Sequence, residues 1–372
     1  MIMPDDHKPY IDLYFLRAKE ILQKEGLNPI VRAKVFIRKV KDGSNQVYGI
    51  NEAVDIIDRY SNLFKNGGKV YALAEGSEYY SKETIMILEG RIQDFIDLET
   101  MYLGVISYNT TMKNDSRHVD IDKVKTNAKE IVDVVEGRPI TYMGPRHWHY
   151  IYDYDITEAA LSGGFTNCST YNGSREKVVG TIPHALENIY AWKYGKENAV
   201  LTSTLAFDRH MNIDIPRIAL VDYNNREITD SLVCAYVLKD RLSGVRVDTC
   251  GENHMEDIGA GPDELAITSG VSVRGVYQLR KKLNEVGFKN IKITLSSGFG
   301  DIEKVKSFIE AEKYFGVKLF DSLGVGGLFE SRMATMDIFE VGENLNRMKL
   351  ISKEGREIND PSIPSELKEV KI

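Results

Sequence analysis

Between residues 139 and 327, short apolar segments alternate with helical stretches, and nearly every apolar segment ends in a polar or glycine-rich cluster. Seven such segments occur, at 140–143, 164–165, 178–179, 218–221, 245–247, 291–295 and 319–321. Strands that alternate with helices are typical of a parallel β/α architecture. In a closed β/α barrel, the carboxyl ends of the strands meet on one face, which holds the active site. The pattern therefore predicts one pocket built from distant parts of the chain.

The regions before and after this part follow a different pattern. Residues 1–115 combine helices with apolar segments that read as antiparallel strands, and after residue 330 the regular alternation fades. We therefore predict an N-terminal α+β domain over 1–115, a barrel domain over 116–329, and a C-terminal tail over 330–372 that packs back on the first domain. A chain of 372 residues is long enough for two domains.

Composition narrows the class of protein. The chain is 42% hydrophobic and 28% charged, and no apolar run approaches the roughly 20 residues of a membrane helix. Its first residues lack the basic and apolar regions of a signal peptide. The three cysteines, Cys168, Cys234 and Cys250, form neither a disulfide framework nor a metal-binding C-x-x-C spacing. We expect a cytoplasmic protein with reduced thiols and no membrane partner.

The charge argues against a nucleic-acid partner. The net charge is −7, so a nucleic acid would need a local basic surface that offsets the overall repulsion. The most basic run, 32–41, alternates with apolar residues. That alternation is typical of a half-buried strand with a solvated basic face. An anionic small substrate would have to be held by local groups.

Two glycine-containing clusters could bind a phosphate. Gly324-Val-Gly326-Gly327 follows an apolar segment, and glycines there let backbone N–H groups approach an anion. Ser296-Ser297-Gly298 follows the preceding apolar segment and would add hydrogen-bond donors. Late loops of a β/α barrel are the usual phosphate site. The alternative is that both clusters are structural turns.

Charged residues at segment ends are further candidates. Arg246 and Asp248 lie two apart on one expected strand, so their side chains share a face. They would contact substrate or form a structural ion pair.

Arg146 follows Met143-Gly-Pro and offers a planar fork for a carboxylate or phosphate. Ser169 and Thr170, which follow the segment at 164–165, are candidate substrate contacts. His147 and His149 lack a third ligand nearby in sequence, so we assign no metal-ligating residues.

His184 is the strongest single candidate for a catalytic residue. It ends the turn Gly180-Thr-Ile-Pro183, which would fix the imidazole at the mouth of the barrel. Asp222 ends the next expected strand, where it could orient the histidine or bind Mg²⁺. A lone histidine is more often structural, so both interpretations stay open.

Taken in order, these clusters resemble the nicotinate phosphoribosyltransferase family. The resemblance rests on motifs spread over nearly the whole chain: Asp12-Leu-Tyr14, Met143-Gly-Pro-Arg146, Gly163-Gly-Phe-Thr-Asn-Cys-Ser169, Gly180-Thr-Ile-Pro-His184, Gly244-Val-Arg246-Val-Asp248-Thr, Ser296-Ser-Gly298 and Gly324-Val-Gly-Gly327. It implies the type II phosphoribosyltransferase fold, an α/β fold with an open α+β sandwich and an irregular seven-stranded barrel. It also implies a homodimer, or an assembly of dimers, with the active site at the subunit interface.

The resemblance also implies a reaction. Nicotinic acid would be joined to 5-phosphoribosyl 1-diphosphate, giving nicotinate mononucleotide and diphosphate for NAD synthesis, with Mg²⁺ and with ATP as co-substrate. By the same resemblance, Tyr14 would stack on the pyridine ring and Arg146 would engage a substrate anion. His184 would be the histidine that ATP phosphorylates.

The remaining roles follow the same likeness. Arg246 and Asp248 would meet base and ribose, and the loop from Gly324 to Gly327 would hold the 5-phosphate. Two departures from the family pattern stand out. Thr249-Cys250-Gly251 replaces the Ser-Gly-Asp of many members, and no cysteine follows Cys250, so we expect no structural zinc.

Four other functions compete with this interpretation. A quinolinate phosphoribosyltransferase would need a denser Arg/Lys cluster for a second carboxylate, and a nicotinamide-using relative is the next rival. A barrel aldolase or isomerase would need a Schiff-base lysine at a strand end, and none of the seven segment ends has one. A non-catalytic barrel would bind ligand without turnover.

Overall fold

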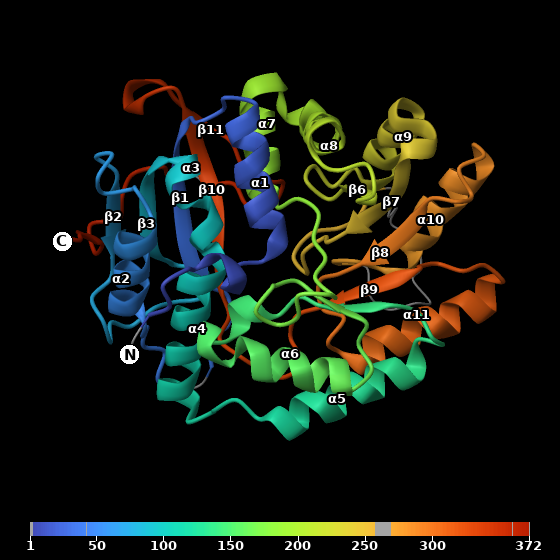
Figure 1. The fold of residues 1–372 in the computed structure, drawn as a ribbon, viewed down its shortest axis with the longest axis horizontal. Coiled ribbons are helices and arrows are strands. Elements are labelled where there is room, and N and C mark those ends of the chain that lie inside the picture. The colour runs from blue at the N-terminus through green and yellow to red at the C-terminus, as the bar shows by residue number, and fades with distance from the viewer. Residues whose placement is uncertain (1–2, 42, 257–268, 359, 372) are drawn as a thin grey trace.

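A computed structural model describes residues 3–41, 43–256, 269–358 and 360–371. Two six-stranded sheets organise it, one antiparallel and one parallel. In Figure 1 the antiparallel sheet lies on the left and the parallel sheet on the right. The mixed α/β class expected from the sequence is thus confirmed. None of the described helices is both long and apolar enough to cross a membrane.

The antiparallel sheet joins the two ends of the chain. Its strands run in the order β11 (Met348–Leu350), β10 (Ala334–Gly342), β1 (Ile30–Ile37), β3 (Thr84–Arg91), β2 (Lys69–Ala72) and β12 (Lys368–Glu369). The basic run is a half-buried strand, as predicted, because β1 alternates between buried and partly exposed positions along its first half. Arg32 on β1 bridges its two neighbouring strands, to Glu89 at 2.7 Å and Glu340 at 2.9 Å.

The parallel sheet forms the other half. Its order is β5 (Asn167–Cys168), β4 (Ile140–Tyr142), β9 (Ser322–Val325), β8 (Lys292–Leu295), β7 (Leu242–Val247) and β6 (Arg217–Leu220). The segment at 178–179, expected as a further strand, makes only an isolated bridge from Val178 to Cys168. The described residues therefore form a six-stranded half-barrel, and a closed seven-stranded barrel is not confirmed.

Helices cover both sheets. They are α1 (Leu13–Lys24), α2 (Ile50–Tyr60), α3 (Ile92–Phe95), α4 (Glu99–Asp115), α5 (Ile121–Val134), α6 (Asp153–Ser162), α7 (His184–Tyr194), α8 (Ala199–His210), α9 (Glu227–Leu238), α10 (Val273–Glu285) and α11 (Ile302–Phe315). In Figure 1, α1 and α7 lie between the sheets, while α9, α10 and α11 lie on the outer side of the parallel sheet.

Two hydrophobic cores form, one around each sheet. Helix α4 is buried along most of its length and serves both, because Leu103 packs in the first core and Tyr108 in the second. Helix α7 likewise contributes Leu186 to the first core although it follows the first strands of the parallel sheet. The domain boundaries at 115 and 330 remain a prediction.

Candidate active site

The candidate residues gather at the carboxyl ends of the parallel strands. Each of these residues follows, within four positions, the last residue of a strand: Arg146 after β4, Ser169 after β5, Asp222 after β6, Asp248 after β7, Ser296 after β8 and Gly326 after β9. Carboxyl ends of parallel strands share one edge of a sheet, which is where ligands bind in α/β folds. The sequence pattern predicted this convergence.

The first group joins strands β7 and β8. Arg246 Nη2 lies 3.1 Å from Asp248 Oδ2, and Arg246 Nε donates to Ser296 Oγ at 2.9 Å. Ser296 Oγ in turn donates to Asp248 Oδ1 at 2.6 Å. The Arg246 and Asp248 side chains thus share a face, as their spacing predicted, and the serine fixes both. Asp248 is the more exposed of the two charges, at 23% of its side chain.

The second group centres on Asp222. His184, the first residue of α7, places Nε2 3.1 Å from Asp222 Oδ1. The other oxygen of Asp222 accepts from the ammonium of Lys353, which comes from the chain that follows β11. Burial alone would raise the pKa of Asp222, but the charges of Lys353 and His184 outweigh it and lower the pKa below its ordinary value. Asp222 therefore stays ionised although it is fully buried.

These two groups meet closely enough to share a cation. His184, Asp222 and Asp248 each offer one ligand atom, and the three atoms lie within 4.8 Å of one another. Two carboxylates fit Mg²⁺, which prefers oxygen ligands and usually keeps bonds to waters and substrate phosphates. The sequence assigned no metal ligands, although it placed Asp222 where Mg²⁺ could bind. The donor set fits such an ion.

A third group surrounds Tyr14 on α1. Tyr14 Oη donates to Asp12 Oδ2 at 3.0 Å, and Arg146 Nη1 donates to Glu99 Oε1 at 2.8 Å. Burial lowers the pKa of Arg146, but Tyr14, Glu99, Asp12 and Asp248 together raise it above its ordinary value. Asp248 belongs to the first group, so the groups lie within electrostatic reach of one another. Burial raises the pKa of Glu99 to about 7, although Arg146 opposes that shift.

The glycine cluster lies at the end of β9, but the prediction that Gly324 belongs to the loop is wrong. Gly324 is inside the strand, because β9 spans Ser322–Val325 and not the apolar segment at 319–321. A Cβ at Gly324 would lie 2.6 Å from the sulfur of Met143, so this glycine is required for packing. Gly326 and Gly327 follow the strand, and a Cβ on Gly326 would lie 3.2 Å from His147 Nε2. The loop is therefore shorter than predicted.

His147 contacts this loop without a charge of its own. Its Nδ1 lies 2.8 Å from Ser331 Oγ, and burial, with help from Arg146 and Lys39, lowers its pKa to about 4. His149 instead places Nε2 2.8 Å from Glu52 Oε1. The two histidines therefore have separate partners.

The serine turn after β8 touches the glycine loop. Ser297 and Gly298 both have positive φ, 71° and 84°, which changes the direction of the chain after the strand. A Cβ on Gly300 would lie 1.9 Å from the carbonyl oxygen of Gly327, so the two backbones are in direct contact. The clusters predicted as one phosphate site thus form one continuous surface.

Ser169 and Thr170 lie deeper than predicted. Both side chains are buried, and Thr170 Oγ1 donates to Asp153 Oδ2 at 2.8 Å. The carbonyl of Ser169 accepts from Leu13 N at 2.8 Å, which ties the start of α1 to the end of β5. Ser169 Oγ has no hydrogen-bond partner among the described residues, and a substrate contact for either residue stays a prediction.

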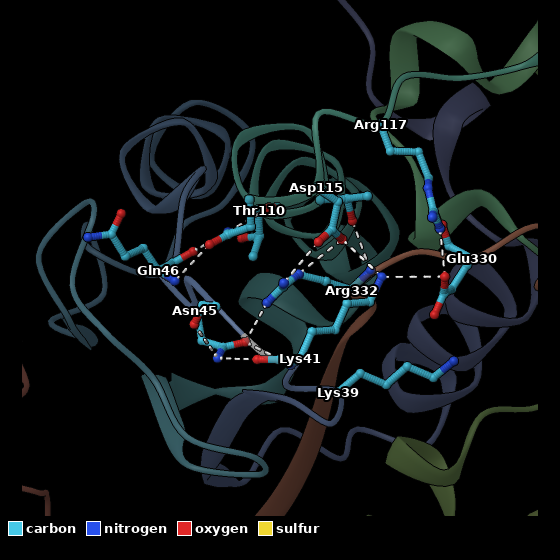
Figure 2. Close-up of polar contacts among 12 residues, drawn as sticks. Lys39, Lys41, Asn45, Gln46, Thr110, Asp115, Arg117, Glu330 and Arg332 are labelled. Carbon is cyan, nitrogen blue, oxygen red and sulfur yellow. Dashed lines mark hydrogen bonds and ion pairs between the residues drawn. The ribbon is translucent and has the colours of Figure 1, made fainter.

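A polar network holds the segment that follows the glycine loop. Figure 2 shows Arg332 reaching Asp115 at the end of α4 and Asn45 in the loop after β1. Its Nε and Nη2 lie 3.1 and 2.9 Å from the two Asp115 oxygens, and Nη1 lies 2.6 Å from Asn45 Oδ1. Lys41 joins Asp115 to Glu330 with contacts of 3.3 and 3.4 Å. The network anchors one end of the loop to the antiparallel sheet.

Sequence reasoning missed three residues of the site. Lys353 follows the last strand of the β10–β11 hairpin in a stretch with no motif, Glu99 opens the buried helix α4, and Glu187 lies one turn after His184. Glu187 Oε2 is 3.9 Å from His184 Nε2, and burial together with Asp222 raises its pKa well above the ordinary value. A glutamate three residues after the histidine on one helix face was the only available signal.

No family model matches the sequence, and no curated protein matches it in a sequence comparison. Solved structures do match. A nicotinate phosphoribosyltransferase from Porphyromonas gingivalis is 13% identical with a TM-score of 0.65, covering 94% of this chain and 96% of that one. One from Vibrio cholerae is 15% identical with a TM-score of 0.65, covering 93% and 88%.

A third structure, from Saccharomyces cerevisiae, carries the same assignment provisionally. It is 16% identical with a TM-score of 0.67 and covers 97% of both chains. This chain has the fold of the nicotinate phosphoribosyltransferases. The resemblance carried by the sequence motifs is confirmed at the level of the fold, and nearly the whole chain takes part in it.

Proposed function

We propose that the protein is a nicotinate phosphoribosyltransferase that joins nicotinate to 5-phosphoribosyl 1-diphosphate in NAD biosynthesis, coupled to ATP hydrolysis. One observation carries the proposal. In this fold, the His184–Asp222 pair and the Arg246–Asp248–Ser296 cluster meet at one end of the parallel sheet, beside the backbone of Gly326 and Gly327. That arrangement offers carboxylates for a cationic sugar, a guanidinium for an anion and a backbone site for a phosphate.

The reaction needs charge stabilisation more than proton transfer. The pyridine nitrogen of nicotinate already carries a free lone pair, so it attacks C1 of the ribose as diphosphate leaves. The transition state is cationic at C1, and the ionised carboxylate of Asp248 stabilises positive charge there. Asp222 and Asp248 would hold Mg²⁺, which when bound would supply positive charge to stabilise the leaving diphosphate. Arg246 holds Asp248 in place.

The base would lie against Tyr14 with its carboxylate toward Arg146. Tyr14 is fixed by Asp12, and Arg146 is fixed by Glu99, so both are ordered before the base arrives. A guanidinium binds a carboxylate with charge-assisted hydrogen bonds, which a neutral amide cannot match. This pairing favours nicotinate over nicotinamide.

ATP would act through His184. The Asp222 carboxylate accepts from Nε2 of the imidazole, which leaves the lone pair of Nδ1 to attack the γ-phosphorus of ATP, and ADP departs. The imidazole is 26% exposed while Asp222 is fully buried, so a phosphoryl donor reaches the ring before the carboxylate. Hydrolysis of the phosphohistidine would then bias the transfer toward product.

The same proposal includes the assembly and the compartment. The enzyme would act as a cytoplasmic homodimer, or a larger assembly of dimers, with the active site near the subunit interface. Light scattering coupled to size exclusion measures the assembly directly. A monomer with full activity would remove the dimer from the proposal and leave the reaction intact.

A coupled assay tests the reaction. Purified protein is given 5-phosphoribosyl 1-diphosphate, Mg²⁺ and one of three bases, with and without ATP, and the mononucleotide product is measured. Nicotinate should turn over fastest and ATP should stimulate it. Turnover of quinolinate with release of CO₂ would replace the proposal with its closest rival. Binding without turnover of any base would make the protein a ligand-binding barrel.

A further inference from the structure

Lys304 is a partly buried cation beside the turn that follows β8. It lies in the first turn of α11, and its Nζ donates to the carbonyl of Ser297 at 2.9 Å and sits 4.6 Å from the ring centre of Phe299. No carboxylate within 4.0 Å pairs with it in the part of the chain that the structure describes, whereas Lys306, two residues on, pairs with Glu303 at 2.7 Å.

The position of Lys304 is unfavourable for the helix itself. The amino end of a helix carries partial positive charge, so a cation in the first turn is repelled. Burial adds to this cost by lowering the pKa of Lys304 to about 8, against the pull of Asp301 and Asp248. A partly buried cation that stabilises neither its helix nor an ion pair is explained if it meets an anion that arrives with a ligand.

The ammonium lies beside the surface already described. A Cβ on Gly298 would lie 3.4 Å from Lys304 Nζ, so the ammonium borders the serine turn. That turn touches the carbonyl of Gly327 through Gly300. An anion on the backbone of Ser297–Gly300 and Gly326–Gly327 would therefore be within reach of Lys304.

We propose that Lys304 binds the 5-phosphate of the ribosyl substrate and supplies the charge that the glycine loop lacks. This inference rests on the proposed function, because it assumes a ribose 5-phosphate group in the site. His147, which also borders the loop, has a pKa lowered by burial to about 4 and provides no charge there near neutral pH. Lys304 is then a binding residue that sets affinity for the phosphate, and it takes no part in bond breaking.

Binding of two anions tests the proposal without catalysis. Ribose 5-phosphate and inorganic phosphate are titrated into wild-type protein, Lys304→Gln, Lys304→Arg and the exposed control Lys306→Gln. Loss of a charge-assisted contact should raise the Kd of ribose 5-phosphate about tenfold or more in Lys304→Gln. Lys304→Arg should recover part of the loss, and Lys306→Gln should match the wild type. Thermal melts of all four proteins show whether a change in Kd comes from partial unfolding or from the lost charge.

The outcomes separate this inference from the proposed function. If Lys304→Gln binds ribose 5-phosphate as tightly as wild type, or if the wild type binds neither anion, the inference is wrong. Unchanged KM for 5-phosphoribosyl 1-diphosphate in an active Lys304→Gln enzyme would likewise overturn it and leave the transferase assignment standing. Lys304-dependent phosphate binding in a protein that makes no mononucleotide would support the anion site and refute the transferase.

Discussion

Asp222 is held by two residues that lie far apart in the sequence, with His184 Nε2 3.1 Å from one oxygen and the Lys353 ammonium on the other. The histidine opens α7, the aspartate follows β6, and the lysine lies in the chain after β11. These contacts therefore connect the parallel sheet to the antiparallel half. The ionised Asp222 also places a negative charge beside His184, the residue that we propose ATP phosphorylates.

Replacing Lys353 should destabilise the fold and disturb the histidine. Lys353→Met leaves the buried Asp222 with only His184 as partner, and breaking a buried pair typically costs about 3–5 kcal/mol. Chemical denaturation measures this change. The control Lys196→Met removes an exposed ion pair with Glu354, from the same segment, and should cost less than about 1 kcal/mol.

The sign of the pH dependence follows from the same pair. The pKa of Asp222 is lowered and that of Lys353 is raised, so the stabilisation holds above the unfolded pKa of the acid and below that of the lysine. Wild-type stability gained from the pair should fade below about pH 4. A Lys353→Met protein as stable as Lys196→Met would show that the pair is dispensable.

His184→Ala should uncouple ATP from transfer. Without the imidazole, no phosphoryl acceptor remains beside Asp222, so substrate-stimulated ATP hydrolysis should disappear. A slow ATP-independent transfer should remain, because Asp248 and Arg246 are untouched. The readouts are ADP release and mononucleotide formation in parallel assays. ATP hydrolysis at the wild-type rate in this variant would exclude a phosphohistidine at position 184.

The strand ends of the site could be predicted from the sequence because they depend on short-range pattern. Arg246 and Asp248 were paired by their spacing of two, and His184 and Asp222 by their places after successive strands. The predictions failed where strand register or tertiary packing determines which residues form a strand. The strand near 319 starts at Ser322, so Gly324 lies inside it, and the segment at 178–179 makes a single bridge.

Other site residues left no local signal. Lys353 enters the site only because the strands β10 and β11 return the chain to the sheet, and Glu99 only because α4 is buried against the β4 loop that carries Arg146. Such contacts arise from long-range packing, which apolar periodicity does not encode. The same limit applies to Lys304. Its position near the glycine loop depends on the packing of the serine turn against that loop, which the sequence pattern does not show.

The buried carboxyl of Asp153 should make stability fall as pH rises. Burial raises its pKa to about 7, against the hydrogen bonds from Thr170 and Asn172. In the unfolded chain the group ionises near pH 3.9, so between pH 4 and 7 the native state binds the extra proton and loses stability as pH increases. Three units correspond to a loss on the order of 4 kcal/mol.

Asp153→Asn removes this titration, so its stability should decline less between pH 4 and 8 than that of wild type. Some decline should persist, because burial also raises the pKa of Glu99 and Glu227 to about 7. Asp155→Asn, an exposed change on the same helix, should keep the full wild-type slope. Denaturation midpoints across this pH range provide the measurement. If stability falls with pH equally in wild type and Asp153→Asn, the raised pKa of Asp153 is contradicted.

Arg332 should matter for stability far more than its neighbour in Figure 2. Its side chain is 2% exposed and bidentate to Asp115, so Arg332→Met would leave a largely buried carboxylate with only Lys41 and cost about 3–5 kcal/mol. Arg117→Met breaks the exposed pair with Glu330 and should cost less than about 1 kcal/mol. Thermal and urea unfolding compare the two. Equal costs would mean that the network does not anchor the loop.

The choice of base should depend on Arg146. A charge-assisted hydrogen bond to the carboxylate of nicotinate contributes about 1.5–3 kcal/mol, against roughly half that for the amide of nicotinamide. At about 1.4 kcal/mol per decade, this difference gives roughly threefold to tenfold discrimination in kcat/KM. Quinolinate carries a second carboxylate beside the attacking nitrogen and would need a further cation there, so it should be rejected.

Arg146→Gln should lower kcat/KM for nicotinate and leave that for nicotinamide nearly unchanged, so the ratio of the two should fall toward one. Arg138→Gln serves as the control, because that arginine is also largely buried, with 9% of its side chain exposed against 23% for Arg146, but pairs with Glu312 on α11, away from the strand ends. Its specificity ratio should equal that of wild type even if its stability drops. The three bases are compared under one set of conditions for all proteins. If the ratio in Arg146→Gln stays at the wild-type value, the carboxylate is bound elsewhere and Arg146 acts only as the partner of Glu99.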